Sequence, residues 1–173
     1  MHKLNKNTYI LSSGMYVDYQ NLWKALDTRI SWYRMNHKRE LSSSSIASLV
    51  SRMLYEKRHF PYYAFNIVVG FDEENNNRPI VWDYDAVGSY GEHSYSVAGS
   101  SSPFFKTFLD NEILCYNFTE KPVEKDADSA SRLLLDGFQS CCERDPQTGD
   151  KVKIVVLDAE GNVEEKEYDL RFD

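Results

Sequence analysis

Two polar segments in the second half of the sequence carry residue types that could do chemistry. The first, Gly99-Ser100-Ser101-Ser102, lies directly before Pro103. Serine hydroxyls can act as nucleophiles, but this run lacks the Gly-x-Ser-x-Gly spacing of a nucleophile elbow. A serine run followed by a proline favours a helix N-terminus, with Pro103 in the first turn of the helix.

The second polar segment reads Arg144-Asp145-Pro146-Gln147-Thr148-Gly149-Asp150. It offers a carboxylate and a threonine hydroxyl that are close together in the sequence. Taken alone, the segment is typical of the turn that follows a helix, and we expect Gly149 to close that turn.

Metal sites and reactive thiols have little support in the sequence. The histidines are scattered, and none forms an i, i+4 pair with another: they are His2, His37, His59 and His93. No cysteine pair has two-residue spacing, and no glycine-rich loop opens a helix after a strand. Cys141 and Cys142 lie on the apolar face of a predicted helix, where packing is a better expectation than a nucleophile. We predict no metal and no cofactor.

Composition limits the function classes. The net charge of −7 argues against nucleic acid and anionic membranes as partners, and no apolar run is long enough to cross a bilayer. The N-terminal residues do not resemble a signal peptide. The odd cysteine count, with Cys115 as the third thiol, fits a reducing compartment, so we expect the protein in the cytoplasm and nucleus.

The first half of the sequence predicts strands and helices in alternation. We expect a strand over Thr8–Ser13 that ends at Gly14, then a helix from about Val17 to Asn36-His37. Apolar residues at helical spacing follow the serine run 42–45, which favours a serine N-cap rather than a linker. We expect Pro61 to end this second helix and to fix the approach to the next strand.

The remaining elements are expected as hairpins and helices within one α+β domain over residues 1–173. The predicted segments are a hairpin of Tyr63–Asp72 with Ile80–Tyr84, a strand near Tyr95–Ala98, a helix from Pro103, a charged connection over Asn117–Lys125, a helix capped by Asp126 or Asp128, and a final hairpin of Val152–Leu157 with Val163–Tyr168.

Several stretches resemble the β-type subunits of the 20S proteasome, and among these the sixth, non-catalytic type. They read Leu-Tyr-Glu-Lys-Arg-His-Phe-Pro-Tyr-Tyr over 54–63, Asp-Tyr-Asp-Ala-Val-Gly-Ser-Tyr over 83–90, Phe-Leu-Asp-Asn over 108–111 and Tyr-Asp-Leu-Arg-Phe-Asp over 168–173. The resemblance covers essentially the whole chain. It implies the four-layer αββα sandwich of the N-terminal-nucleophile hydrolases, here with the first two strands missing.

The resemblance also gives the two polar segments a second interpretation. In catalytic members they support an N-terminal threonine nucleophile, whose own α-amino group assists as the base. Ser100 matches the supporting serine, whereas Ser101 replaces a glycine. Asp145 matches an aspartate that holds the α-amino group, Thr148 stands for a serine, and Asp150 replaces a glycine. A scaffold can keep such a turn after losing the chemistry.

The family's threonine, lysine and second aspartate would all fall upstream of Met1. Thr8 is no substitute, because no Gly-Thr cleavage pair precedes it and it lies in a predicted strand. We therefore expect no catalytic residue in this chain. We also expect the working protein to have a longer N-terminus, because losing the first hairpin would leave strand backbone groups unpaired.

The resemblance implies a non-catalytic structural subunit. Its partners would be the other α- and β-type subunits of a hetero-oligomeric, twenty-eight-subunit core particle, and regulatory particles indirectly. The particle degrades ubiquitin-tagged proteins. Such interfaces are large and obligate, so the isolated chain should expose apolar surface. Two alternatives remain: a processed N-terminal-threonine endopeptidase whose nucleophile segment is absent from this sequence, and a free-standing binding module.

Overall fold

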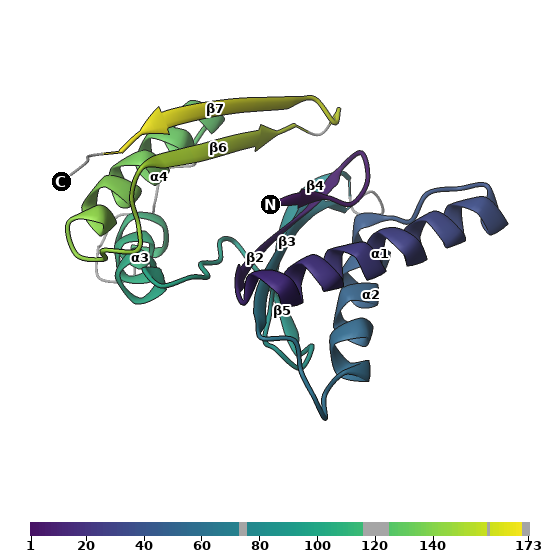
Figure 1. The fold of residues 1–173 in the computed structure, drawn as a ribbon. Helices are drawn as coiled ribbons and strands as arrows, with labels where there is room; N and C mark the ends of the chain where they lie inside the picture. Colours follow the sequence, from purple (N-terminus) through teal and green to yellow (C-terminus); the bar gives the residue numbers. More distant parts are fainter. Residues whose placement is uncertain (73–75, 116–124, 159, 171–173) are drawn as a thin grey trace. The chain divides into compact units, whose positions relative to one another are not determined.

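The computed structural model describes residues 1–72, 76–115, 125–158 and 160–170 (Figure 1). The chain divides into two compact units. Unit 1 comprises Met1–Gly99 with Ala159–Gly161, and unit 2 comprises Ser100–Asp158 with Asn162–Asp173. Each unit contains an antiparallel sheet and helices, so the predicted α+β class is confirmed.

The sheet of unit 1 has five antiparallel strands that follow one another in sequence order. They are β1 (His2–Lys3), β2 (Thr8–Gly14), β3 (Ala64–Asp72), β4 (Arg78–Tyr84) and β5 (Tyr90–His93). The register places Val68 opposite both Ile10 and Trp82. Because side chains alternate across a sheet, these three residues share one face, and all three belong to the same buried core.

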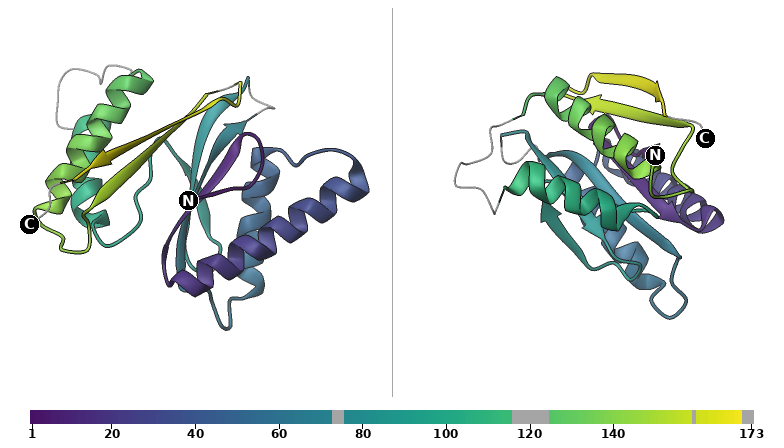
Figure 2. Two further views of the ribbon diagram at one scale, coloured as in Figure 1. Left: turned by 45° about the horizontal axis from the view of Figure 1, so that its top comes forward. Right: turned by 90° about the vertical axis from the view of Figure 1, so that its left-hand side faces the viewer.

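Both helices of unit 1 cover this same face of the sheet (Figures 1 and 2). They are α1 (Tyr16–His37) and α2 (Ser43–Glu56). Leu22, Leu26 and Ile30 recur at helical spacing on α1 and are buried, as the pattern predicts. The most deeply buried side chains of this core are entirely inaccessible to solvent: Ile10, Leu22, Leu26, Ile46, Val50, Leu54 and Val68.

The two ends of α2 differ in how well the sequence predicts them. The Ser42 hydroxyl accepts a hydrogen bond from the Ser45 backbone N–H at 3.3 Å, which confirms the serine N-cap. The prediction that Pro61 ends the helix is wrong. The helix ends at Glu56, and turns with hydrogen bonds from Lys57 N to Leu54 O unwind the chain before the proline is reached.

The last strand of unit 1 lies earlier than predicted. Tyr95–Ala98 is not a strand, whereas Tyr90–His93 pairs with β4. The Asp85 carboxylate accepts hydrogen bonds from the N–H groups of Val87 and Ser89, and Gly88 adopts a positive φ of 90°. This tight turn returns the chain at once, so the strand begins directly after it.

Unit 2 contains helices and a two-stranded hairpin. Its elements are α3 (Ser102–Leu109), the π-helical turn η1 (Asp110–Leu114), α4 (Ala127–Cys142), β6 (Lys151–Leu157) and β7 (Val163–Asp169). Asp126 caps α4, because its carboxylate accepts a hydrogen bond from the Ser129 N–H at 2.9 Å. Of the two predicted caps, Asp126 and Asp128, the first is therefore the correct one. The expected connection over Asn117–Lys125 lies almost entirely outside the described residues.

Packing within unit 2 brings the start of α3 close to the end of α4. Leu134 and Phe138 of α4 pack on the hairpin residues Val152 and Ile154. On another side of α4, a Cβ added at Gly137 would lie 2.9 Å from the ring of Phe105 on α3, so the lack of a side chain at this position lets the ring approach α4 closely. None of the helices in the described ranges is long and apolar enough to cross a bilayer.

Candidate functional site

The two polar segments meet at the carboxylate of Asp145. Its Oδ2 accepts hydrogen bonds from the Ser100 hydroxyl at 2.6 Å, the Ser101 hydroxyl at 2.5 Å and the Thr148 hydroxyl at 2.9 Å. Its Oδ1 accepts the backbone N–H of Gln147 at 3.0 Å. We call these five residues the Asp145 cluster.

Two helix ends position the cluster. Ser101 is the N-cap residue of α3, while Asp145 lies just beyond the C-terminus of α4, where its N–H donates to the Cys141 carbonyl at 2.9 Å. The Thr148 N–H then donates to the Asp145 carbonyl at 3.1 Å and folds the turn back. The N-terminus of α3 therefore supplies the serine hydroxyls, and the turn after α4 supplies Asp145 and Thr148.

The predicted role of Gly149 in closing this turn is wrong. The residue with a left-handed backbone is Asp150, whose φ is 59°, and its carbonyl accepts the Leu170 N–H at 2.8 Å. Short polar side chains tolerate this conformation better than most non-glycine residues do. By the sequence resemblance, Asp150 is also the residue that replaces a glycine of the catalytic β-type subunits.

The hydrogen bonds around Asp145 keep its carboxylate ionised. Only 8% of the residue is exposed. The hydroxyls of Ser100 and Ser101, followed by the Gln147 N–H, hold the pKa of this carboxyl well below its usual range. A carboxylate with so low a pKa is a weak base at neutral pH, because it has little tendency to take up a proton.

The cluster therefore has the properties of a polar clasp. Among the described residues, no histidine or lysine side chain hydrogen-bonds to the Asp145 carboxylate. The Ser101 and Thr148 hydroxyl oxygens also lie 2.5 Å apart. The hydroxyls that could act as nucleophiles are thus bound to a weak base and to one another.

The structure brings together Ser100, Asp145 and Thr148, as the matching positions predict. It adds Ser101, which the sequence analysis had noted only as a replacement for glycine and which donates to the same carboxylate. Thr8 is fully buried, and its hydroxyl lies 2.7 Å from that of Ser43, so it serves the packing of β2 against α2.

The cysteines of α4 are packing residues. Cys141 is buried, and Cys142 packs against the hairpin core of unit 2. Burial raises the pKa of both thiols, so neither is an activated thiolate. All three cysteines are free thiols. The thiol of Cys115, which directly follows η1, donates to the backbone carbonyl of Asn111 within that turn.

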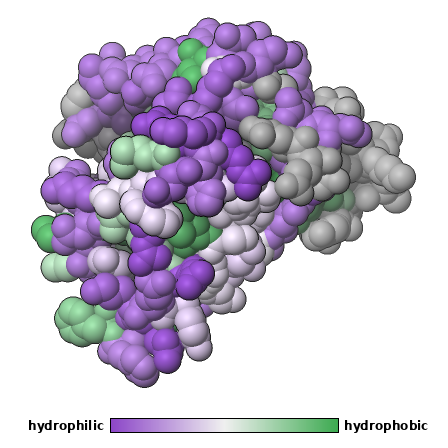
Figure 3. All heavy atoms as spheres, turned by 90° about the vertical axis from the view of Figure 1, so that its right-hand side faces the viewer, coloured by the Kyte–Doolittle hydropathy of each residue, from purple (hydrophilic) through white to green (hydrophobic). Residues whose placement is uncertain are grey.

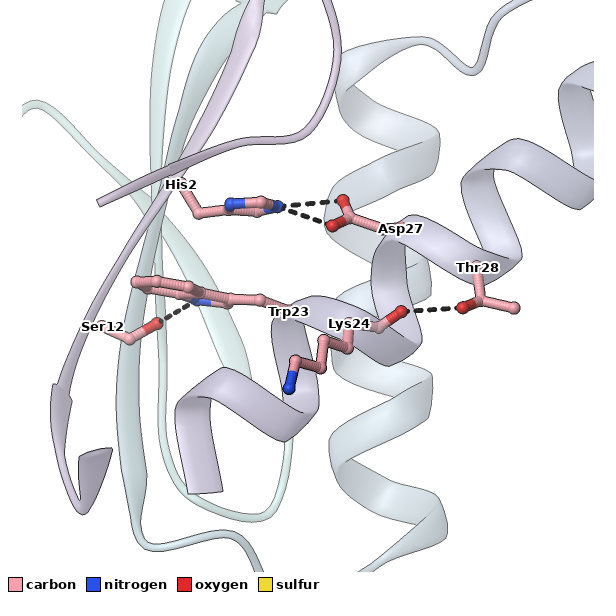
Figure 4. Close-up of polar contacts among 6 residues, drawn as sticks. All are labelled: His2, Ser12, Trp23, Lys24, Asp27 and Thr28. Carbon is pink, nitrogen blue, oxygen red and sulfur yellow. Dashed lines mark hydrogen bonds and ion pairs between the residues drawn. The ribbon is translucent and has the colours of Figure 1, made fainter. Parts of the chain in front are cut away.

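The histidines do not converge with one another. The His2 ring nitrogen Nε2 lies 2.9 Å from both carboxylate oxygens of Asp27, and the ring stacks on Trp23 with centroids 5.1 Å apart (Figure 4). In unit 1, His93 pairs with Asp83 at 3.1 Å. Within the described ranges, no group of three or more histidine, cysteine or carboxylate side chains is placed to hold a metal ion.

One polar network in unit 1 was missed by sequence reasoning. Trp23 Nε1 donates to the Ser12 hydroxyl at 2.9 Å (Figure 4). That hydroxyl in turn donates to the Asn66 side-chain oxygen at 2.6 Å. The network links α1 to β2 and β3. No local pattern could reveal it, because the three residues come from separate elements.

Comparison with known proteins agrees with the resemblance. The sequence matches the proteasome subunit family over residues 1–157, which include the whole Asp145 cluster. The chain belongs to the proteasome subunit family. The family match covers residues 1–99 of unit 1 and continues into unit 2 as far as the end of β6.

Similar proteins within this family include several named β type-1 subunits and one named a probable β type-6 subunit. Proteasome subunit beta type-1-B of Carassius auratus is 38% identical over 165 residues, which cover 95% of this chain and 69% of the relative. Proteasome subunit beta type-1 of Arabidopsis thaliana is 38% identical over 178 residues, which cover 100% of this chain and 78% of the relative. Probable proteasome subunit beta type-6 of Schizosaccharomyces pombe is 32% identical over 170 residues, which cover 93% of this chain and 75% of the relative.

Proposed function

We propose that this chain is a non-catalytic, structural β-type subunit of the 20S proteasome core particle. Its partners are the α- and β-type subunits with which it shares the particle. The family match and the β type-1 relatives support its place in the β ring. In this role the chain contributes walls and interfaces to the proteolytic chamber, while other subunits cleave the substrate.

The match to relatives named β type-1 carries the non-catalytic part of the proposal, because the resemblance identifies this type as non-catalytic. The lowered pKa of Asp145 keeps its carboxylate ionised, so the group acts as a hydrogen-bond acceptor rather than as a base. Its hydrogen bonds to Ser100, Ser101 and Thr148 join the N-terminus of α3 to the turn after α4. The geometry favours a clasp that fixes two helix ends.

The exposed side chains of unit 1 support a role in assembly. Phe60 is 88% exposed, and several aromatic and aliphatic residues near it in the sequence or at the start of α1 are more than half exposed: Met15, Tyr16, Val17, Tyr55 and Tyr63. So many large apolar side chains are unusual on the surface of a monomeric protein. They are typical of surfaces that become buried against other subunits.

The finer architecture also belongs to the proposal. The face of the unit 1 sheet opposite α1 and α2 is apolar, with Leu11 paired to Ile67 and Val69 paired to Val81. A sheet that is apolar on both faces is expected to be covered on both. We propose that the unit 1 sheet is one of the two inner layers of a four-layer αββα sandwich, and that this apolar face packs against the other sheet.

Two further parts of the proposal concern the biological setting. The free state of the three thiols is compatible with a reducing compartment, which supports placement in the cytoplasm and nucleus. Degradation of ubiquitin-tagged proteins is a property of the assembled particle, and this subunit would take part in it through assembly alone.

The experiment compares particles assembled with the wild-type chain and with an Asp145→Asn variant. Affinity-tagged chains are expressed in their host, and the particles are purified and quantified by native mass spectrometry. A clasp role predicts fewer particles with the variant but unchanged peptidase activity per particle. Asp136→Asn, an exposed position on α4, is the control for loss of a carboxylate.

Two results would contradict the proposal. Absence of the tagged wild-type chain from α- and β-containing particles would remove its assignment as a subunit. A normal yield of Asp145→Asn particles with one peptidase activity lost would assign chemistry to the cluster.

A further inference from the structure

A groove on the outer side of unit 1 lies between α1 and α2. It has a volume of about 430 Å³, and its apolar wall is formed by Trp32, Tyr33, Leu41 and Leu49. Leu41 and Leu49 also pack against the core beneath the helices, so the floor of the groove is firmly supported. Trp32 is 62% exposed, although tryptophan is usually largely buried.

Figure 3 shows the side of the molecule on which α1 ends and the chain leads into α2. Apolar surface is visible there among predominantly hydrophilic residues. An apolar groove with charged residues at its rim is a form that binds a short segment of another chain through an inserted side chain.

The rim of the groove is positively charged. Arg29 and Arg52 both line it, and they share a single carboxylate, that of Glu56. Arg29 binds Glu56 through two contacts, at 2.7 and 3.3 Å, whereas Arg52 lies 3.6 Å from it. Two guanidinium groups and one carboxylate leave one excess positive charge. Arg39 adds another cation, hydrogen-bonded to the Tyr33 hydroxyl at 3.0 Å.

The wider sequence shows the same asymmetry. Residues 24–58, which include most of α1, the connection and all of α2, contain eight lysines and arginines against three acidic residues, a net charge of +5. The remaining residues therefore carry −12, because the whole chain has a net charge of −7. A basic surface on an acidic protein selects an acidic partner by charge complementarity.

We propose that this groove binds an acidic segment of another subunit, which inserts one aliphatic or aromatic side chain beside Trp32 and Leu49 and places a carboxylate against Arg52. The inference rests on the proposed function, because the partner segment is assigned to a neighbour in the same particle. Arg29 is already held by Glu56, so Arg52, whose side chain is 78% exposed, is the main donor to the incoming carboxylate.

The test introduces a photo-crosslinking residue into the groove of the full chain within assembled particles. Ser48→p-benzoylphenylalanine replaces an exposed residue that lines the groove. We expect irradiation to join it to one segment of another subunit, and mass spectrometry should identify that segment as net acidic with an aliphatic or aromatic residue at the crosslink.

Charge variants in the same background test the carboxylate contact. Arg52→Glu should reduce the crosslink yield about tenfold, since like charges would then face each other. Arg52→Lys should retain most of the yield. Lys24→Glu makes the same change in net charge on the exposed side of α1, outside the groove, and should leave the yield within about twofold.

The outcomes separate this inference from the proposed function. Failure of the tagged chain to enter particles would overturn both. If the chain is incorporated, the groove proposal alone is overturned by any of four results: a crosslink to a basic segment, a crosslink to a second copy of this chain, no protein crosslink, or equal effects of Arg52→Glu and Lys24→Glu.

Discussion

Each of the two compact units is stabilised internally by a different kind of interaction. In unit 1, two helices bury an aliphatic layer against a five-stranded sheet, and residues such as Ile10 and Leu26 are wholly inaccessible. Unit 2 has a smaller apolar core around Val152 and Ile154, and an ionised carboxylate, Asp145, fastens the junction of α3 and α4. Stability should therefore depend on packing volume in unit 1 and on hydrogen bonding and pH in unit 2.

The sequence offers separate probes for the two units. All three tryptophans, Trp23, Trp32 and Trp82, lie in unit 1, whereas all three cysteines, Cys115, Cys141 and Cys142, lie in unit 2. Tryptophan fluorescence therefore follows the unfolding of unit 1, and thiol labelling follows the opening of unit 2.

The largest effect is expected for Leu26→Ala in unit 1. Removing this wholly buried side chain should lower the free energy of unfolding by about 2–5 kcal/mol, because a cavity remains under the helices. Urea unfolding followed by tryptophan fluorescence measures the change. Met35→Ala, at an exposed position of the same helix, should change it by less than about 0.5 kcal/mol. Equal effects would show that α1 is not packed as described.

Asp145→Asn should act on unit 2 alone. An amide cannot accept the same set of hydroxyl donors, so α3 and α4 should separate more often and expose Cys141. We expect labelling of Cys141 to become faster on the order of tenfold, with the tryptophan transition unchanged. Asp136→Asn serves as the matched control. A loss of the tryptophan signal in parallel would contradict the division into two independently held regions.

The N-cap of α2 provides a test in unit 1 with a smaller expected effect. Ser42→Ala removes the acceptor of the Ser45 N–H and should lower the free energy of unfolding by about 1 kcal/mol. Tryptophan fluorescence during urea unfolding detects this, while Cys141 labelling should stay constant. Ser48→Ala, an exposed serine within the same helix, is the control, and an equal loss from it would argue against the cap.

The smallest effect concerns pH. Because the pKa of Asp145 is lowered in the folded protein, its contribution to stability is complete above about pH 4, the unfolded value, and declines as the pH falls below it. Ser101→Ala removes one donor and raises the pKa of this carboxyl toward its usual range. The variant should differ most from the wild type at neutral pH, and the difference should shrink below about pH 4.

A dipyridyl disulfide, which reacts with thiols in acid, can measure this dependence through Cys141. The ratio of labelling rates between Ser101→Ala and the wild type should fall toward one as the pH falls. A ratio that stays constant or grows in acid would show that the Ser101 hydrogen bond does not stabilise the ionised carboxylate.

The elements that the sequence predicted well have local causes. The helical spacing of Leu22, Leu26 and Ile30 located α1, and Ser42 located the start of α2. The strand after β4 was predicted near Tyr95–Ala98, whereas the tight turn at Asp85 brings Tyr90–His93, including Gly91, into β5. A glycine inside a short strand cannot be told from a turn residue without the pairing partner.

The candidate site was only partly predictable. Ser100, Asp145 and Thr148 were singled out by their matching positions, but the sequence did not show that Ser101 donates to the same carboxylate. That contact depends on the approach of α3 to α4 at Gly137, which is a tertiary event. Contacts of this kind have no local pattern, because their residues lie more than forty positions apart.

The most direct test of the central claim is covalent labelling of the purified particle with an electrophilic probe that reacts with N-terminal threonine nucleophiles. Intact-mass analysis then records which subunits have gained the mass of the probe. Our account predicts that other β subunits gain it while this chain keeps its mass. A probe adduct on this chain would contradict the account and would assign it to the proteolytic subunits.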